Sequence, residues 1–212
     1  MKDPRFPDRC RRVLAAKGTL RLAAFGSSTT AGYGASDPAH SYPEVLRALL
    51  SPRMPNGIAL FSHGISGESC EEMAGRVGAV LDDRPDLVIW QTGSNDAARP
   101  VPLDRFVALT AAGLDRFAAA DLDLVLMDQQ YSDALEAVPD LPRYRDALHR
   151  LAAVRGVPLF PRYAIMRGWC EHGRFDRTAL SPDGTHMTDA GYAALAAAVA
   201  DWLCARLEPA SA

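Results

Sequence analysis

The chain has 212 residues, of which 48 % are apolar and 23 % are charged, and its formal net charge is −3. A chain of this length fits a single domain, residues 1–212, that buries about 70 % of the surface exposed when unfolded. Its mild acidity argues against a nucleic-acid partner, and the absence of about 18 consecutive apolar residues argues against a membrane span.

The cysteines and the first twenty residues indicate the cellular setting. The four cysteines are widely spaced and form neither a CxxC pair nor a zinc-ligand pattern. We therefore expect free thiols, while a single disulfide such as Cys170 with Cys204 is also compatible with the sequence. The first twenty residues mix charges and prolines without the apolar stretch of a signal peptide, so we expect a cytoplasmic protein. The sequence predicts no metal and no cofactor.

Short apolar runs predict five β-strands in chain order. Because these runs are apolar almost throughout, we expect both faces of each strand to be covered. They span residues 19–25, 58–62, 86–91, 123–128 and 157–161.

Segments with helical spacing separate the runs. Two of them open with a capping-box pattern, Ser41 with Glu44 and Ser69 with Glu72. One-sided apolar stripes in three of these segments favour packing against a core. The stripes are Val45, Leu46 and Leu49, then Met73, Val77, Val80 and Leu81, then Phe106, Leu109, Gly113 and Phe117.

The second half of the chain continues the alternation of strand and helix. Helices are predicted over 141–155, with Gly156 as the stop, and over 188–207. Alternation of this kind is typical of an α/β protein, a three-layer α/β/α sandwich around a parallel sheet of about five strands. In such sheets ligands bind beyond the carboxyl ends of the strands.

Four loops have an unusual composition. Three follow predicted strands and one precedes the last helix; they read GSSTTAGYG (26–34), HGISGES (63–69), TGSNDAARP (92–100) and LSPDGTHMTDAGY (180–192). Together they resemble the blocks of the SGNH/GDSL hydrolase superfamily of GDSL-like lipases and esterases. GSSTT is similar to GDSxT, GISG to NxGxxG, GSND to GxND and DGTH to DxxH. Each motif is weak alone, but four in this order make a specific signal.

The resemblance implies a flavodoxin-like sandwich that hydrolyses carboxylic esters, and it assigns residue roles. Ser28 would be the nucleophile, His186 the general base and then the acid, and Asp183 the group that fixes the imidazole tautomer. The backbone N–H of Ser28, with Gly67 and Asn95, would form the oxyanion hole. The spacing suits this chemistry, since Asp and His three residues apart can share one turn.

The chain departs from the family pattern at two positions. Ser27 stands where the family has the Asp of GDSxT, and Ser62 where it has the Asn of NxGxxG. Neither position belongs to the triad or the oxyanion hole, so the assigned chemistry survives. The first change removes a carboxylate that could help to hold the nucleophile loop.

Three aromatic or imidazole side chains are candidates for the substrate pocket: His63, Tyr131 and Trp169. Trp169 also falls on an apolar stripe with Ile165 and Met166, which favours packing over substrate contact. The absence of a long apolar lid favours small acyl groups, so the expected partner is a small-molecule or carbohydrate ester.

Two other functions fit parts of the sequence. A flavodoxin-like module would use SSTTAG after the first strand to hold the phosphate of a flavin mononucleotide. The Asp183 and His186 pair argues against it, because a phosphate cradle has no use for such a pair. A pseudoenzyme that binds acylated glycans without turnover is disfavoured because every proposed catalytic position holds a competent residue.

Overall fold

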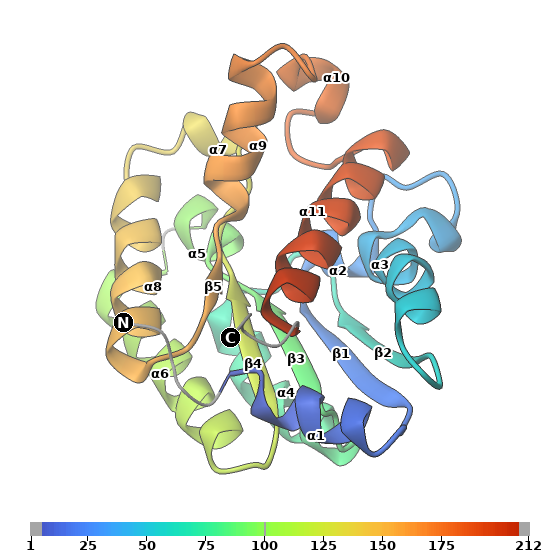
Figure 1. The fold of residues 1–212 in the computed structure, drawn as a ribbon. Helices are drawn as coiled ribbons and strands as arrows, with labels where there is room; N and C mark the ends of the chain where they lie inside the picture. The colour runs from blue at the N-terminus through green and yellow to red at the C-terminus, as the bar shows by residue number, and fades with distance from the viewer. Residues whose placement is uncertain (1–5, 100, 208–212) are drawn as a thin grey trace.

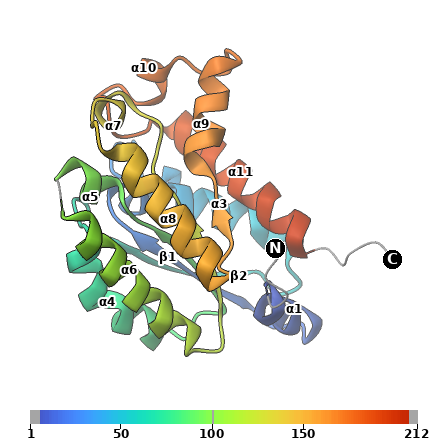
Figure 2. The same ribbon diagram turned by 90° about the vertical axis from the view of Figure 1, so that its left-hand side faces the viewer.

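The protein is a three-layer α/β/α sandwich, as the sequence predicts. The computed structural model describes residues 6–99 and 101–207. Their parallel sheet has the strand order β2-β1-β3-β4-β5, with helices on both faces (Figures 1 and 2). The strands are β1 (Leu20–Gly26), β2 (Ile58–Gly64), β3 (Leu87–Gln91), β4 (Asp123–Met127) and β5 (Leu159–Phe160).

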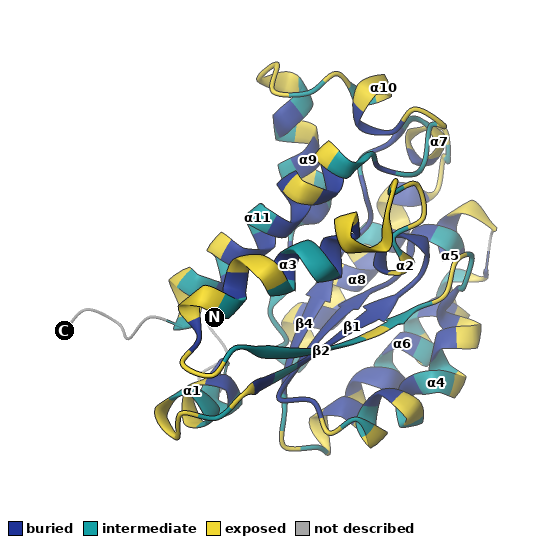
Figure 3. Cartoon of the chain, turned by 90° about the vertical axis from the view of Figure 1, so that its right-hand side faces the viewer, coloured by how far each residue is buried: buried dark blue, intermediate teal, exposed yellow. Residues whose placement is uncertain are grey.

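All five predicted strands are present, and they differ in burial. The strands β1, β3 and β4 are apolar and almost wholly buried. Side chains of β2 pack against both cores, Leu60 on one face and Phe61 on the other, but the strand is only half-buried (Figure 3). The reason is its place at the edge of the sheet, where only β1 pairs with it.

The two faces of the sheet carry separate apolar cores. One core lies under α3 (Tyr42–Leu50), α9 (Arg162–Glu171) and α11 (Asp189–Leu207), and α1 (Asp8–Ala15) joins it near the amino ends of the strands. The other core lies under α4, α6 and α8. These helices span Cys70–Asp82, Leu103–Ala118 and Leu141–Arg155. Gly156 ends α8 in the left-handed conformation, as predicted.

One of the two predicted capping boxes forms. Ser69 and Glu72 cap α4 reciprocally, through the Ser69 side chain and the Glu72 carboxylate. The prediction for Ser41 is wrong: its hydroxyl donates to the carbonyl of Pro38, and Glu44 pairs with Arg47 instead. The 3₁₀ turn η1 (Pro38–His40) directly precedes Ser41. Its first carbonyl, that of Pro38, accepts the hydrogen bond from the hydroxyl that would otherwise have capped α3.

The last helix is apolar because it packs inside the fold. By length and composition alone, α11 is the one helix of the described residues that could cross a membrane. Its residues Tyr192, Leu195, Val199 and Leu203 are buried, and the helix lies against α3. All four cysteines are free thiols, as expected.

The carboxyl ends of the parallel strands meet at one edge of the sheet, at the top of Figure 1. Four short helices lie there: α2 (Ser28–Ala31), α5 (Ser94–Ala98), α7 (Asp133–Glu136) and α10 (Arg177–Leu180). The 3₁₀ turn η2 (Ser51–Arg53) follows α3 directly. The polar loops singled out in the sequence therefore lie together at the carboxyl ends of the strands, beside the four short helices.

Candidate active site

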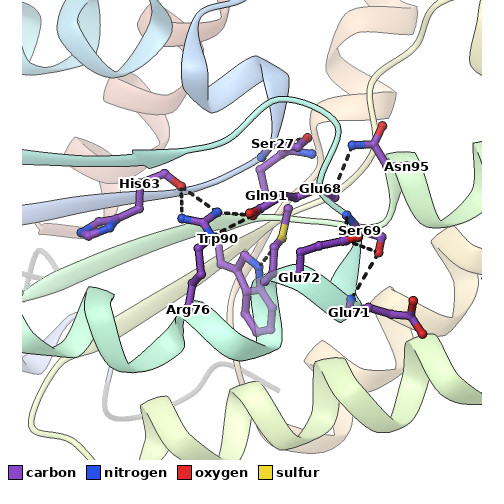
Figure 4. A network of polar contacts seen from close by, with 11 residues as sticks. Ser27, His63, Glu68, Ser69, Glu71, Glu72, Arg76, Trp90, Gln91 and Asn95 are labelled. Carbon is purple, nitrogen blue, oxygen red and sulfur yellow. Dashed lines mark hydrogen bonds and ion pairs between the residues drawn. The ribbon is translucent and has the colours of Figure 1, made fainter.

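The turn that carries Ser28, the predicted nucleophile, is the junction of β1 and α2, and is called the nucleophile turn below. Ser28 is the first residue of α2 and is buried, and its N–H has no acceptor among residues 6–99 and 101–207. Ser27 faces elsewhere: its N–H and its hydroxyl both donate to Gln91 Oε1, at 3.0 and 3.2 Å (Figure 4). An N–H left free at the start of a helix is a ready donor to an anion. Within this turn, Ser27 is therefore engaged by Gln91, whereas the N–H of Ser28 is free among the described residues.

Asp183 and His186 form a hydrogen-bonded pair in the loop before α11. The Asp183 Oδ2 to His186 Nδ1 distance is 2.6 Å, and Asp183 Oδ1 accepts the backbone N–H groups of Thr185 and His186. Burial opposes ionisation of Asp183, but these hydrogen bonds outweigh it and lower its pKa below the ordinary value. An ionised carboxylate at Nδ1 fixes the tautomer that leaves Nε2 free to accept a proton.

The segment after the nucleophile connects it to the histidine. The N–H of Tyr33 donates to the carbonyl of Ser28 at 2.9 Å, and the Tyr33 ring lies over the His186 ring with centroids 4.3 Å apart. A side chain at Gly34 would come within 3.1 Å of His186 Cβ, so glycine permits this close approach. Tyr192 fixes the segment by donating to the carbonyl of Tyr33 at 2.6 Å.

Ser28 and His186 thus lie on either side of one short segment. No hydrogen bond joins their side chains in the described part of the chain. Catalytic hydrogen bonds are often long before substrate binds and tighten in the complex. The structure therefore connects the predicted base and the predicted nucleophile through Tyr33, which contacts both residues.

The loop after β2 carries the second expected oxyanion donor. The N–H of Ile65 donates to the carbonyl of Gly26 at 3.1 Å, which fastens this loop to the nucleophile strand. Gly67 has a φ of +83°, which favours glycine, and its N–H has no acceptor among the described residues. Asn95 donates through Nδ2 to the carbonyl of Glu68 at 2.8 Å (Figure 4). An amide group has two N–H donors, so one stays available.

An ion pair beneath the loop holds it in place. Arg76 on α4 donates through Nε to Glu68 Oε2 at 2.8 Å and through both terminal nitrogens to the carbonyl of His63 at 3.3 Å (Figure 4). Both charged side chains are largely buried. The chain on both sides of Gly67 is therefore tied to α4, and Asn95 is tied to the same loop.

Asn95→Ala tests the third donor. We expect kcat to fall by roughly 10² to 10³ with little change in KM, because the amide would act on the developing oxyanion more than on bound substrate. Steady-state kinetics on a p-nitrophenyl ester measures both constants. Asn56→Ala is the matched control, since Asn56 lies before β2 at the other end of the sheet and its amide contacts Lys17. A rise in KM with kcat within about threefold would make Asn95 a substrate-binding residue instead.

Two of the three expected pocket residues lie outside this group. The His63 ring turns away from Asn95 and contacts Asp83 at the end of α4, with Nε2 2.6 Å from Oδ2 (Figure 4). Trp169 packs against Phe175 with its side chain buried in the core under α9. The packing of Trp169 agrees with its place on an apolar stripe, and a contact between His63 and substrate stays a prediction.

Tyr131 stays beside the site. The segment that holds it runs along the Asp183 turn, because Gln130 donates to the carbonyl of Thr185 and the N–H of Ala134 donates to that of Gly184. The hydroxyl of Tyr131 accepts from Arg177 at 3.1 Å. A contact between Tyr131 and substrate stays a prediction.

No sequence motif singles out Tyr33, whose ring lies over that of His186. Tyr33 is 56 % exposed, and Ile65 in the loop after β2 is 46 % exposed, so both side chains lie at the surface. The available signal was the GYG at the end of the first loop, an aromatic residue between two glycines. Arg99 also went unnoticed; its guanidinium lies 2.9 Å from where a side chain at Gly67 would begin.

Other parts of the molecule offer less for chemistry. Among the described residues, no group of three or more His, Cys, Asp or Glu side chains is placed to hold a metal ion. A hollow of about 250 Å³ includes Arg9, Arg12 and Asp121 in its lining. Both arginines there are already paired with Asp121. The hollow lies by the amino ends of the strands, opposite the edge that holds Ser28 and His186.

Comparison of the whole sequence with protein families shows the family to which the chain belongs. The model of the Non-GDSL lipase-like family matches residues 4–208, nearly the full length. The chain belongs to the Non-GDSL lipase-like family. This places it in the SGNH/GDSL hydrolase-like superfamily, as the four sequence blocks indicated. No curated protein matches the sequence.

Solved structures share the fold of this Non-GDSL lipase-like protein at low sequence identity. A two-domain esterase (CEX) active on acetylated mannans is 20 % identical with a TM-score of 0.79, covering 95 % of this chain but 54 % of its own. This chain thus spans about half the length of that esterase. The acetyl xylan esterase AlAXEase has a TM-score of 0.76 and 20 % identity, covering 86 % and 99 % of the two chains.

A lipase/acylhydrolase from Enterococcus faecalis is similar to the same degree. Its TM-score is 0.76 and its identity 20 %, and the alignment covers 92 % of this chain and 100 % of that one. At this identity the likeness establishes the fold, and the function has to be argued from the site.

Proposed function

We propose that this protein is a serine ester hydrolase that removes short acyl groups, above all acetyl, from a carbohydrate or another small molecule. The observation that carries the proposal is the Asp183 and His186 pair held against the Ser28 turn by Tyr33. A loop serine with a purely structural role needs no imidazole fixed by a carboxylate beside it.

The mechanism follows from the donors and acceptors of the site. His186 Nε2 takes the proton of Ser28 as Oγ attacks the ester carbonyl, and Asp183 stabilises the imidazolium that forms. The carbonyl oxygen becomes an oxyanion that accepts from the N–H groups of Ser28 and Gly67 and from the Asn95 amide. His186 then gives its proton to the leaving alcohol. Water attacks the acyl-enzyme by the same route in reverse and releases the acid.

The substrate class is supported by the site rim and by the structural relatives. The exposed ring of Tyr33 offers a flat apolar face beside the base, a surface suited to a sugar ring. Ile65 offers a small apolar contact in the oxyanion loop. Two of the structures with this fold are esterases acting on acetylated mannans and acetyl xylan. Acetylated oligosaccharides are therefore the first substrates to test.

A chain-length series tests the proposal. We expect kcat/KM on p-nitrophenyl esters to be highest for acetyl or butyryl groups and to fall steadily for longer chains, because residues 6–99 and 101–207 form no long apolar lid. Release of acetate from acetylated xylan and mannan oligosaccharides tests the alcohol side. An optimum at long acyl chains would contradict the short-acyl assignment. A protein without turnover that holds flavin would contradict hydrolysis itself and favour the phosphate-binding function.

A further inference from the structure

A buried arginine lies next to the nucleophile turn. Arg162 is the first residue of α9, directly after β5, and its side chain has no solvent exposure. Its Nη2 donates to Thr29 Oγ1 at 3.1 Å. Thr29 is the residue after Ser28 in α2, so the guanidinium reaches the nucleophile turn from a segment 133 residues away.

The charge of this arginine has no ion-pair partner in the described part of the chain. Asp128 is the carboxylate that acts on it electrostatically. The oxygens of Asp128 are occupied by His149 Nε2 at 2.8 Å and the N–H of Tyr163 at 2.9 Å. Nε and Nη1 of Arg162 make no hydrogen bond to any described residue.

Such an arrangement is costly for the fold alone. Burial lowers the pKa of Arg162 to about 10, so the side chain is still a cation at neutral pH. A buried charge without a partner destabilises the folded state relative to an apolar side chain of similar size. Tyr42 and Tyr192 are buried near Arg162, and burial raises the pKa of each to about 12. Both tyrosines are therefore uncharged at neutral pH and do not neutralise the guanidinium.

We propose that Arg162 is a positioning residue for the nucleophile, holding α2 through Thr29 and setting a positive charge beneath the turn that carries Ser28. The inference rests on the proposed function, in which Ser28 attacks the ester. A fixed positive charge in a low-dielectric interior favours the negative charge that develops at the neighbouring oxyanion. Ser27 is held by Gln91, and Arg162 holds Thr29, two residues further along the chain.

Three variants and one control test the proposal by esterase kinetics and thermal unfolding. Arg162→Met removes the charge and the donors at similar length, Arg162→Lys keeps the charge, and Thr29→Val removes the acceptor at similar shape. Arg167→Met is the control, because Arg167 lies on the same helix, is exposed, and forms an ion pair with Glu171. Its kcat should stay within about twofold of wild type.

We expect Arg162→Met to lower kcat roughly 10- to 100-fold with KM nearly unchanged, the scale of a misplaced reacting group. Arg162→Lys should recover part of this loss. The double variant with Thr29→Val should be no slower than Arg162→Met alone, because both changes break one contact. Activity near wild type in folded Arg162→Met, or additive losses in the double variant, would overturn the proposal.

The remaining variants and Ser28→Ala distinguish a failure of this proposal from a failure of the proposed function. If Arg162→Met does not fold, the kcat of Thr29→Val and Arg162→Lys decides: near-wild-type values in both overturn the proposal. If Ser28→Ala retains esterase activity, the proposed function fails, whatever the Arg162 variants do. A protein whose activity needs Ser28 but is indifferent to Arg162 contradicts this inference alone.

Discussion

Ser28→Ala should lower the turnover of p-nitrophenyl acetate by at least about 10³, the scale seen when a member of a catalytic triad is lost. The physical reason is that no other hydroxyl shares the position of Ser28 at the start of α2, with its N–H free and the His186 segment alongside. The fold should be unaffected, because the change removes one oxygen without altering the turn. Steady-state kinetics and thermal unfolding of the purified variant measure both effects.

Ser27→Ala is the matched control for that variant. The hydroxyl of Ser27 already donates to Gln91 Oε1, and Ser27 is less exposed than Ser28, 3 % against 8 %. We expect this variant to stay within about tenfold of wild type, since it loses one hydrogen bond near the site. Full activity in Ser28→Ala together with an inactive Ser27→Ala would make Ser27 the nucleophile and contradict the role proposed for Ser28.

Asp183→Asn should lower kcat by roughly 10³ to 10⁴ while the loop keeps its shape. Asparagine can still accept the backbone N–H groups of Thr185 and His186, but its amide side can favour the wrong imidazole tautomer. Asp189→Asn is the control, because its carboxylate binds Ser36 and His40 near the same loop. Kinetics at saturating substrate gives kcat for both variants.

The pH dependence of this effect follows from the direction of the shift. The pKa of Asp183 is lowered, so the carboxylate is charged at every pH above its ordinary value of about 4. Its stabilising contribution is present throughout that range and is lost only as the pH falls through the lowered pKa. The deficit of Asp183→Asn should therefore persist from pH 5 upwards. Activity recovering to wild type anywhere in that range would contradict the role given to Asp183.

Local patterns predicted most of the fold because they reflect burial along the chain. Apolar runs marked all five strands, and Gly156 marked the end of α8. The exposure of β2 could not be predicted, because strand order decides which strand stands at the edge. Ser41 shows a second limit: its hydroxyl had a closer partner in a turn that the capping pattern does not contain.

The candidate site was predictable where chemistry lies in short motifs. The blocks around Ser28, Asn95 and His186 named residues that the sheet then gathers at one edge. No motif predicts the contact between the His63 ring and Asp83, which only the folded structure brings together, and a role for His63 at the substrate stays a prediction. Arg162 lies in no motif, and only the pairing of β4 with β5 brings it to Thr29.

Covalent labelling tests the central claim most directly. A fluorophosphonate reacts with a serine that is activated by a neighbouring base, and digestion followed by mass spectrometry locates the adduct. We predict one adduct per chain, on Ser28, with loss of esterase activity in proportion to labelling and no adduct in Ser28→Ala or on the unfolded protein. An adduct on Ser27 or elsewhere, or an active enzyme that takes no label, would contradict a Ser28 nucleophile.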